Sequence, residues 1–326
     1  MTPRQFALLG ALASMWGASY LLIKYALEDF SPAMVVFVRT ALGAGVLYAI
    51  IRAQAGEARA QLADIRRRPT TALLLGALAI SAPFLLISFG EREVPTGLTA
   101  VLIASAPLWV AIFAPALDRS ETVAGRQALG LIVGIAGVAL LVGVESIGTL
   151  GQFLGALAMV GAAGFYALSS FMVKSTYREV PALTTSFISV GAGCLLVLPV
   201  AAATPPDHAP GLRSILALAA LGAFGTAIAF VIFYALIGEL GAGRAALVSY
   251  LVPPISLAYG ALLLDEQIGL AAIGGMVLIL AGVTLASRAP RPAPEGAEAG
   301  PCVEEEEEAA AVMEAPVATG ASRSSS

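Results

Sequence analysis

Arg39 is the side chain with the clearest chemical potential in this sequence, because it lies in the otherwise apolar stretch VVFVRTALGAGVLYAI, residues 35–50. A guanidinium at the centre of a membrane helix costs about 2.5–3.5 kcal/mol on insertion scales, so its charge needs a partner. Two interpretations are open. Arg39 either has a structural role and fixes this segment against its neighbours, or it binds a substrate carboxylate. The candidate acidic partners within the chain are Glu28, Asp29, Glu91 and Glu93.

A further group of polar or amphipathic side chains lies in apolar stretches and could face a central cavity. Its members are Trp16, Ser19, Tyr20, Trp109, Tyr166, Ser169, Tyr234 and Tyr250. Each of them could instead pack between helices or, near a helix end, belong to an interfacial aromatic belt. As a set, they suit an amphipathic solute such as an amino acid better than a bare ion. Lys24 is expected to extend its charge to the membrane interface.

Prolines interrupt two apolar stretches near mid-membrane, at Pro107 and at the pair Pro253 and Pro254. Proline removes a backbone donor and frees a carbonyl, and such a break is tolerated where neighbours or a water-lined cavity satisfy that carbonyl. We therefore expect helix breaks that line a cavity at these positions. Simple kinks are the alternative.

The elements that must position these residues are membrane helices. Of the 326 residues, 58% are hydrophobic and only 12% are charged, and the mean hydropathy is +0.87. The apolar runs are long and continuous, as in membrane helices, and lack the alternation of barrel strands. We predict an all-α membrane protein whose ten transmembrane helices span 6–26, 32–52, 70–90, 95–117, 125–143, 151–173, 181–203, 214–236, 242–264 and 268–287.

The sequence does not provide the residues of an intramembrane enzyme. A serine protease of this kind needs a membrane histidine, and a zinc protease needs an H-E-x-x-H helix. The only histidine, His208, falls in a predicted outer loop, and the two cysteines have no obvious partners. We therefore expect no catalytic residue, no metal and no cofactor. We also expect no nucleic-acid partner, only the lipid bilayer and a small-molecule substrate.

The distribution of Lys and Arg predicts the orientation, since these residues collect in cytoplasmic loops. With the N-terminus inside, only Arg92 and Arg213 of the 18 basic residues fall in outer loops, and only Lys24 and Arg39 fall within spans. We expect a multi-pass protein of the plasma (inner) membrane with both termini cytoplasmic. Residues 289–326 are rich in Pro, Ala, Glu and Ser and are predicted to form a disordered acidic cytoplasmic tail, either simply solvated or bound to a partner.

The two halves of the chain echo each other. Trp16 aligns with Tyr166 and Pro107 with Pro253, and residues 121–140 resemble residues 266–285. Each half holds five predicted spans, an odd number, so the second copy must enter the membrane from the opposite side. Such inverted repeats, here 6–143 and 151–287, let two halves expose a midplane site alternately to each face.

Several segments in these repeats carry recognisable motifs: WGASYLLIKYAL at 16–27, SPAMVVFVRTALG at 31–43, the segment at 97–117, the segment at 240–268, and the Gly-rich fifth and tenth spans. Together they resemble the drug/metabolite transporter (DMT) superfamily, in its EamA family of paired five-helix repeats. The resemblance implies a transmembrane transporter, an exporter or exchanger of small metabolites such as amino acids. The alternative is a membrane sensor or scaffold that signals through the acidic C-terminal tail.

Glycines in the fifth and tenth spans have small-xxx-small spacing, in GLIVGIAG at 130–137 and GGMVLILAG at 274–282. This spacing permits close contact between helices. We expect packing within the subunit, with a homodimer face as the alternative.

Overall fold

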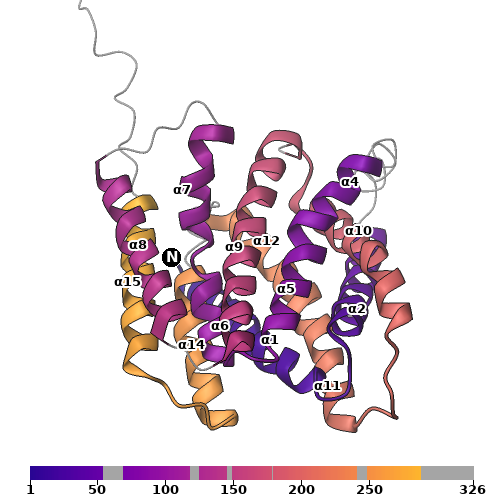
Figure 1. Ribbon diagram of the computed structural model, residues 1–326. Coiled ribbons are helices and arrows are strands. Elements are labelled where there is room, and N and C mark those ends of the chain that lie inside the picture. Colours follow the sequence, from indigo (N-terminus) through magenta and orange to yellow (C-terminus); the bar gives the residue numbers. More distant parts are fainter. Residues whose placement is uncertain (54–68, 118–124, 145–148, 178, 241–247, 288–326) are drawn as a thin grey trace, which may run out of the picture. The chain divides into compact units, whose positions relative to one another are not determined.

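The structure is a computed structural model, and it describes residues 1–53, 69–117, 125–144, 149–177, 179–240 and 248–287 (Figure 1). All regular secondary structure in these ranges is helical, with no strand. This confirms the all-α part of the predicted fold class as far as these residues reach. The predicted acidic tail, residues 289–326, lies outside them.

The first half of the chain contains helices that coincide with the first five predicted spans. They are α1 (Pro3–Ala26), α2 (Pro32–Ala53), α4 (Pro69–Gly76) continuing through the π-helix η1 (Ala77–Ser81) into α5 (Ala82–Gly90), α6 (Thr96–Ile103), α7 (Ala106–Leu117) and α8 (Arg126–Val144).

The second half repeats this order. Its helices are α9 (Leu150–Thr176), α10 (Ala182–Ala203), α11 (Leu212–Gly222) continuing through the π-helix η2 (Ala223–Ile228) into α12 (Ala229–Leu240), α14 (Val248–Leu263) and α15 (Leu270–Ser287).

Within the described residues, seven helical stretches are long and apolar enough to cross a membrane. They are Pro3–Ala26, Pro32–Ala53, Pro69–Gly90, Thr96–Leu117, Leu150–Thr176, Ala182–Ala203 and Leu212–Phe233. The predicted spans 125–143, 242–264 and 268–287 fall on shorter apolar helices, Ala128–Val142, Val248–Leu263 and Leu270–Leu285. The total of ten spans therefore stays a prediction.

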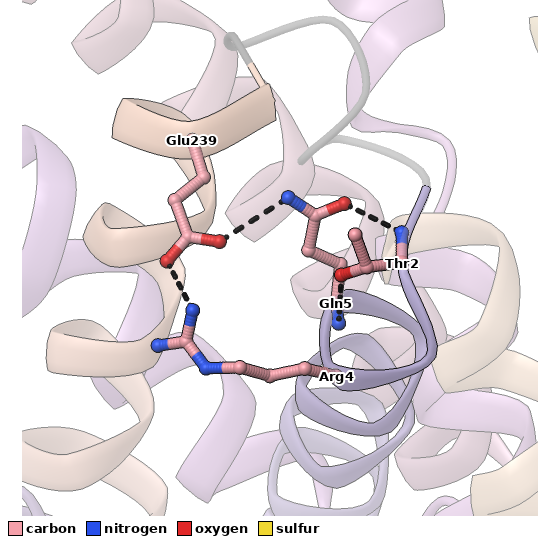
Figure 2. Close-up of polar contacts among 4 residues, drawn as sticks. All are labelled: Thr2, Arg4, Gln5 and Glu239. Atoms are coloured by element: carbon pink, nitrogen blue, oxygen red, sulfur yellow. Dashed lines mark hydrogen bonds and ion pairs between the residues drawn. The ribbon is translucent and has the colours of Figure 1, made fainter.

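The same N-terminal cap begins α1 and α9. The Thr2 hydroxyl accepts a hydrogen bond from the backbone N–H of Gln5 at 3.3 Å, and the Thr149 hydroxyl accepts one from the backbone N–H of Gln152 at 3.1 Å. In α1 the Gln5 side chain also accepts a bond from the Thr2 backbone, which completes a capping box (Figure 2). These caps satisfy backbone donors that would otherwise lack partners where each helix starts.

A π-helix also occurs at the matching place in each half. In both, a hydroxyl side chain donates to the carbonyl five residues earlier: Ser81 to Gly76 at 3.3 Å, and Thr226 to Leu221 at 3.2 Å. π-helical turns are rare and frequently lie at functional sites. They widen the helix locally, and here η2 packs against α1 and α2 of the first half.

Two pairs of matching helices, α2 with α10 and α8 with α15, pack side by side and antiparallel. The helices α8 and α15 lie side by side in Figure 1, and along them Gly134 lies against Gly282 and Leu141 against Gly275. Along α2 and α10, Gly43 lies near Val190 whereas the Phe37 carbonyl accepts a weak hydrogen bond from Cys194 Sγ at 3.9 Å. The glycines of the fifth and tenth predicted spans are thus used for packing within the chain.

The prolines differ in their effect. The helix is interrupted between α6 and α7 just before Pro107, in agreement with the predicted break. At Pro253 and Pro254, however, α14 continues without interruption. A proline removes only its own hydrogen bond to the preceding turn. Packing of α14 along α1 and α6 holds the helix together across that loss.

Candidate functional site

Arg39 lies on α2 with only 5% of its surface exposed. Its guanidinium carbon sits 4.0 Å from the centroid of the Phe84 ring on α5. One of its terminal nitrogens, Nη2, donates to the Thr226 hydroxyl of η2 at 3.4 Å. Its Nε has no hydrogen-bond partner. The positive charge is therefore buried and only partly satisfied.

Two tyrosines complete the surroundings of this charge. Tyr20 on α1 and Tyr166 on α9 lie within electrostatic range of Arg39 and of each other. Both are half-buried, and both pack against the main hydrophobic core. The site is thus assembled from α1, α2 and α5 of the first half and from α9 and η2 of the second. We call Arg39, Tyr20, Tyr166, Phe84 and Thr226 the Arg39 site.

These partners compensate the burial of Arg39 incompletely. A cation–π contact contributes about 2 kcal/mol or more when it is desolvated, but a hydrogen bond of 3.4 Å exceeds the usual range and is weak. No ion pair to Arg39 occurs among the described residues. A buried guanidinium in this state can accept a planar anion such as a carboxylate, which it binds through paired hydrogen bonds.

The proposed acidic partners of Arg39 do not pair with it. Glu28 forms an ion pair with Arg213 at 3.3 Å, and Asp29 accepts the backbone N–H of Gly211 at 2.8 Å. The Glu93 carboxylate lies beside Gly151, and Glu91 is fully buried with no hydrogen-bond partner on either oxygen. The fold turns Glu28 and Asp29 toward the start of α11 because α11 packs against α1.

Ser19 and Trp16 adjoin the Arg39 site along the same face of α1. Ser19 donates to the Met15 carbonyl at 2.9 Å and touches η2, since a Cβ on Gly225 would lie only 2.6 Å from its hydroxyl. The Trp16 ring packs on Phe230 and Phe233 of α12, with centroid distances of 6.3 and 5.2 Å. This close approach of α1 and η2 places Thr226 within reach of Arg39.

Among the described residues, the remaining predicted site residues make no contact with Arg39. Ser169 donates to the Tyr166 carbonyl at 2.8 Å within its own helix. Trp109 packs on Phe113 at 5.4 Å, and Tyr250 packs against the main core. The side chain of Tyr234 lies outside the described part of the structure. Phe84 and Thr226 were missed, although Thr226 matches Ser81 in the repeat.

The described residues contain no group of His, Cys, Asp and Glu side chains that could hold a metal ion. The family model of the EamA-like transporter family matches residues 5–143 and, a second time, residues 153–288. The chain belongs to this family. It is accordingly a multi-pass membrane transporter of the drug/metabolite type.

Its relatives are similar over most of their length. The chain is 26% identical to the "uncharacterized transporter YvbV" of Bacillus subtilis, over 86% of this chain and 91% of the relative. It is 28% identical to the "probable terminal-alkyne amino-acid exporter" of Streptantibioticus cattleyicolor, over 84% and 90%. It is 26% identical to the "probable amino-acid metabolite efflux pump" of Salmonella typhimurium, over 82% and 90%.

A solved crystal structure shares the fold, with a TM-score of 0.61 and 18% sequence identity. The match covers 88% of this chain and 97% of the other chain. It therefore extends across both halves of the EamA-family fold.

Proposed function

We propose that this EamA-family transporter exports small amphipathic metabolites such as amino acids, and that Arg39 binds their carboxylate. The observation that carries the proposal is a buried guanidinium without a carboxylate partner, placed where helices of both halves meet. Tyr20 and Tyr166 would add hydroxyl donors, and Trp16, Phe84 and Phe230 would add an apolar wall. Such a site suits a solute with a charged end and an apolar body.

Transport by alternating access requires two halves that can rock about the site. The two matches to the family model, the shared Thr caps of α1 and α9, and the π-helices η1 and η2 support two repeats, 6–143 and 151–287. The antiparallel packing of α2 on α10 and of α8 on α15 supports their inversion. We infer ten spans, with both termini on the cytoplasmic side of the plasma (inner) membrane.

A polar contact between the halves lies where α1 begins and α12 ends. Arg4 pairs with Glu239 at 2.9 Å, and the Gln5 side chain donates to the same carboxylate at 3.2 Å (Figure 2). The Gln5 and Arg4 hydrogen bonds hold the pKa of Glu239 below its ordinary value, so the contact persists at neutral pH. It is solvent-exposed, and exposed ion pairs are weak. A contact of this kind can form and break in each transport cycle.

The names of two relatives support an amino-acid-like class of substrate. Both are named for the export of amino acids or their metabolites. An amino acid carries a carboxylate for Arg39 and an apolar side chain for the aromatic wall. We therefore place carboxylate-bearing, amino-acid-like solutes first among the substrates, with net movement outward.

The test is efflux from proteoliposomes loaded with a mixture of amino acids and other small metabolites, with released solutes identified by mass spectrometry. We expect selective release by the wild type. Arg39→Ala should lower release of carboxylate-bearing solutes by at least about tenfold, because a hydrogen bond to a charged group contributes about 1.5–3 kcal/mol. Arg52→Ala, an exposed arginine on the same helix, is the matched control and should behave as the wild type.

Two outcomes would contradict this function. The first is folded, inserted wild-type protein that releases no solute. The second is a loss of function when residues 289–326 are removed, which would favour the alternative function, a sensor or scaffold acting through this tail. A transporter should keep its full efflux when these residues are removed, whereas a tail-dependent protein should lose its function.

A further inference from the structure

Glu91 is a buried carboxylate that has no role in the solute site described above. It follows the last residue of α5 and has 0% of its surface exposed. Neither of its oxygens has a hydrogen-bond partner, and the neighbouring hydroxyls of Ser88 and Thr96 are also buried without one. An isolated buried carboxylate anion is costly, so such a group either carries a proton or acquires a partner in another state.

The charged and titratable groups that face Glu91 come from several elements. From α1 come Lys24 and Tyr20, from the segment after α14 comes Glu266, and from α6 comes the hydroxyl of Thr99. From α2, Arg39 lies over Phe84, two turns before Glu91 on α5. The helix α9 packs against Gly90 at this point through Met159 and the backbone of Gly155.

The groups beside Glu91 are engaged elsewhere. The Lys24 ammonium donates to the Val94 carbonyl at 2.9 Å and forms no ion pair with Glu91, and its side chain is half-exposed. That it extends to the membrane interface stays a prediction. Glu266 accepts the backbone N–H groups of Thr96 and Gly97 at 2.8 and 3.3 Å. The Thr99 hydroxyl donates to the Pro95 carbonyl at 3.3 Å. To pair with Glu91, the Lys24 ammonium must leave the Val94 carbonyl.

Burial raises the pKa of the Glu91 carboxyl to about 8, while nearby Lys24 acts in the opposite direction. The group lies one residue beyond the apolar stretch Pro69–Gly90. A raised carboxyl pKa means that the proton is bound below about pH 8 and released above it. Proton uptake and release therefore fall close to physiological pH.

Tyr20 connects this group to the Arg39 site, because it lies within electrostatic range of both Glu91 and Arg39. A solute carboxylate on Arg39 adds negative charge near Tyr20, and a second negative charge on Glu91 then becomes less favourable. Solute binding should consequently favour the protonated form of Glu91.

We infer that Glu91 is a proton-binding site coupled to the solute site, so that a proton at Glu91 and a solute carboxylate at Arg39 bind together. When the proton leaves, Lys24 neutralises the Glu91 anion. This inference rests on the proposed function for its coupling but not for the proton site itself. The two parts can therefore be tested separately.

The proton site is tested by infrared difference spectroscopy of purified protein titrated across neutral and alkaline pH. We expect a protonated-carboxyl band that disappears with a midpoint near pH 8. The band should be absent in Glu91→Gln and retained in Glu93→Gln, an exposed glutamate two residues away. In Lys24→Met the midpoint should move upward, because the opposing charge is gone. A Glu91 band that titrates near the ordinary glutamate pKa of about 4.3 would overturn the inference.

The coupling is tested by calorimetry of solute binding in buffers of different ionisation enthalpy. Near pH 8 the wild type should take up a fraction of a proton for each amino acid bound, and Glu91→Gln should take up none. If wild type and Glu91→Gln take up protons equally, the coupling is wrong although transport stands. If efflux fails but the infrared band titrates as expected, the proposed function is wrong and the proton site stands.

Discussion

Arg39 carries the chemistry at the scale of single residues. Its presence in an apolar segment was enough to predict a buried charge, but its partners could not be predicted, since Phe84 and Thr226 belong to other helices with their own apolar patterns. The four nearby carboxylates were reasonable candidates by sequence distance. The fold directs Glu28 and Asp29 to the start of α11 and buries Glu91 elsewhere.

The tyrosine hydroxyls beside Arg39 give a prediction at this scale. Tyr20→Phe and Tyr166→Phe should each weaken binding of an amino acid by about twofold to tenfold, because a neutral hydrogen bond contributes about 0.5–1.5 kcal/mol. The measurement is the dissociation constant in detergent. Tyr48→Phe, an exposed tyrosine on α2, is the control. Unchanged affinity in both Tyr20→Phe and Tyr166→Phe would remove the hydroxyls from the site.

The helices show which parts of the fold could be read from the sequence. Apolar runs placed them correctly, because a membrane helix must be continuous and apolar to bury its backbone. The π-helices η1 and η2 could not be predicted from hydropathy, since one extra residue in a turn leaves the apolar pattern unchanged. Pro253 and Pro254 predicted a break that α14 does not have, because neighbouring helices hold it.

The contact between α8 and α15 gives a prediction for these elements. Gly282→Ala would press its Cβ into the Gly134 backbone, and such overpacking costs about 1–3 kcal/mol. The thermal midpoint in detergent should fall by several degrees. On the same helix, the Cβ of Gly274→Ala would make an ordinary van der Waals contact with Leu140 at 3.7 Å, so this variant should unfold as the wild type. Equal midpoints for Gly282→Ala and the wild type would show that this contact is not tight.

At the scale of the whole molecule, the Arg39 site lies between the two halves of the chain. Helices of both halves contribute to it. Trp16 and Tyr166 were aligned as repeat mates from the sequence, and the structure brings the helices that carry them, α1 and α9, to the same site. The sequence could indicate the repeat because aromatic, proline and glycine-rich positions recur in the same order in both halves. It could not indicate which aromatic residues meet, since that depends on helix rotation.

Inversion of the repeats predicts that the matching starts of α1 and α9 face opposite sides of the membrane. In a background with Cys194→Ala and Cys302→Ser, Thr2→Cys and Leu150→Cys each place one cysteine at an exposed helix start. A membrane-impermeant maleimide added to intact cells should label Leu150→Cys at once and Thr2→Cys only after permeabilisation. Labelling of both from the same side would contradict the inverted arrangement.

The central claim is that a buried arginine between two rocking halves carries solutes by their carboxylate. The most direct measurement compares efflux of an amino acid with efflux of its carboxamide, from proteoliposomes containing wild type or Arg39→Ala. The account predicts that the wild type prefers the acid and that Arg39→Ala loses this preference while remaining folded. An Arg39→Ala protein that still prefers the acid as strongly as the wild type would contradict it.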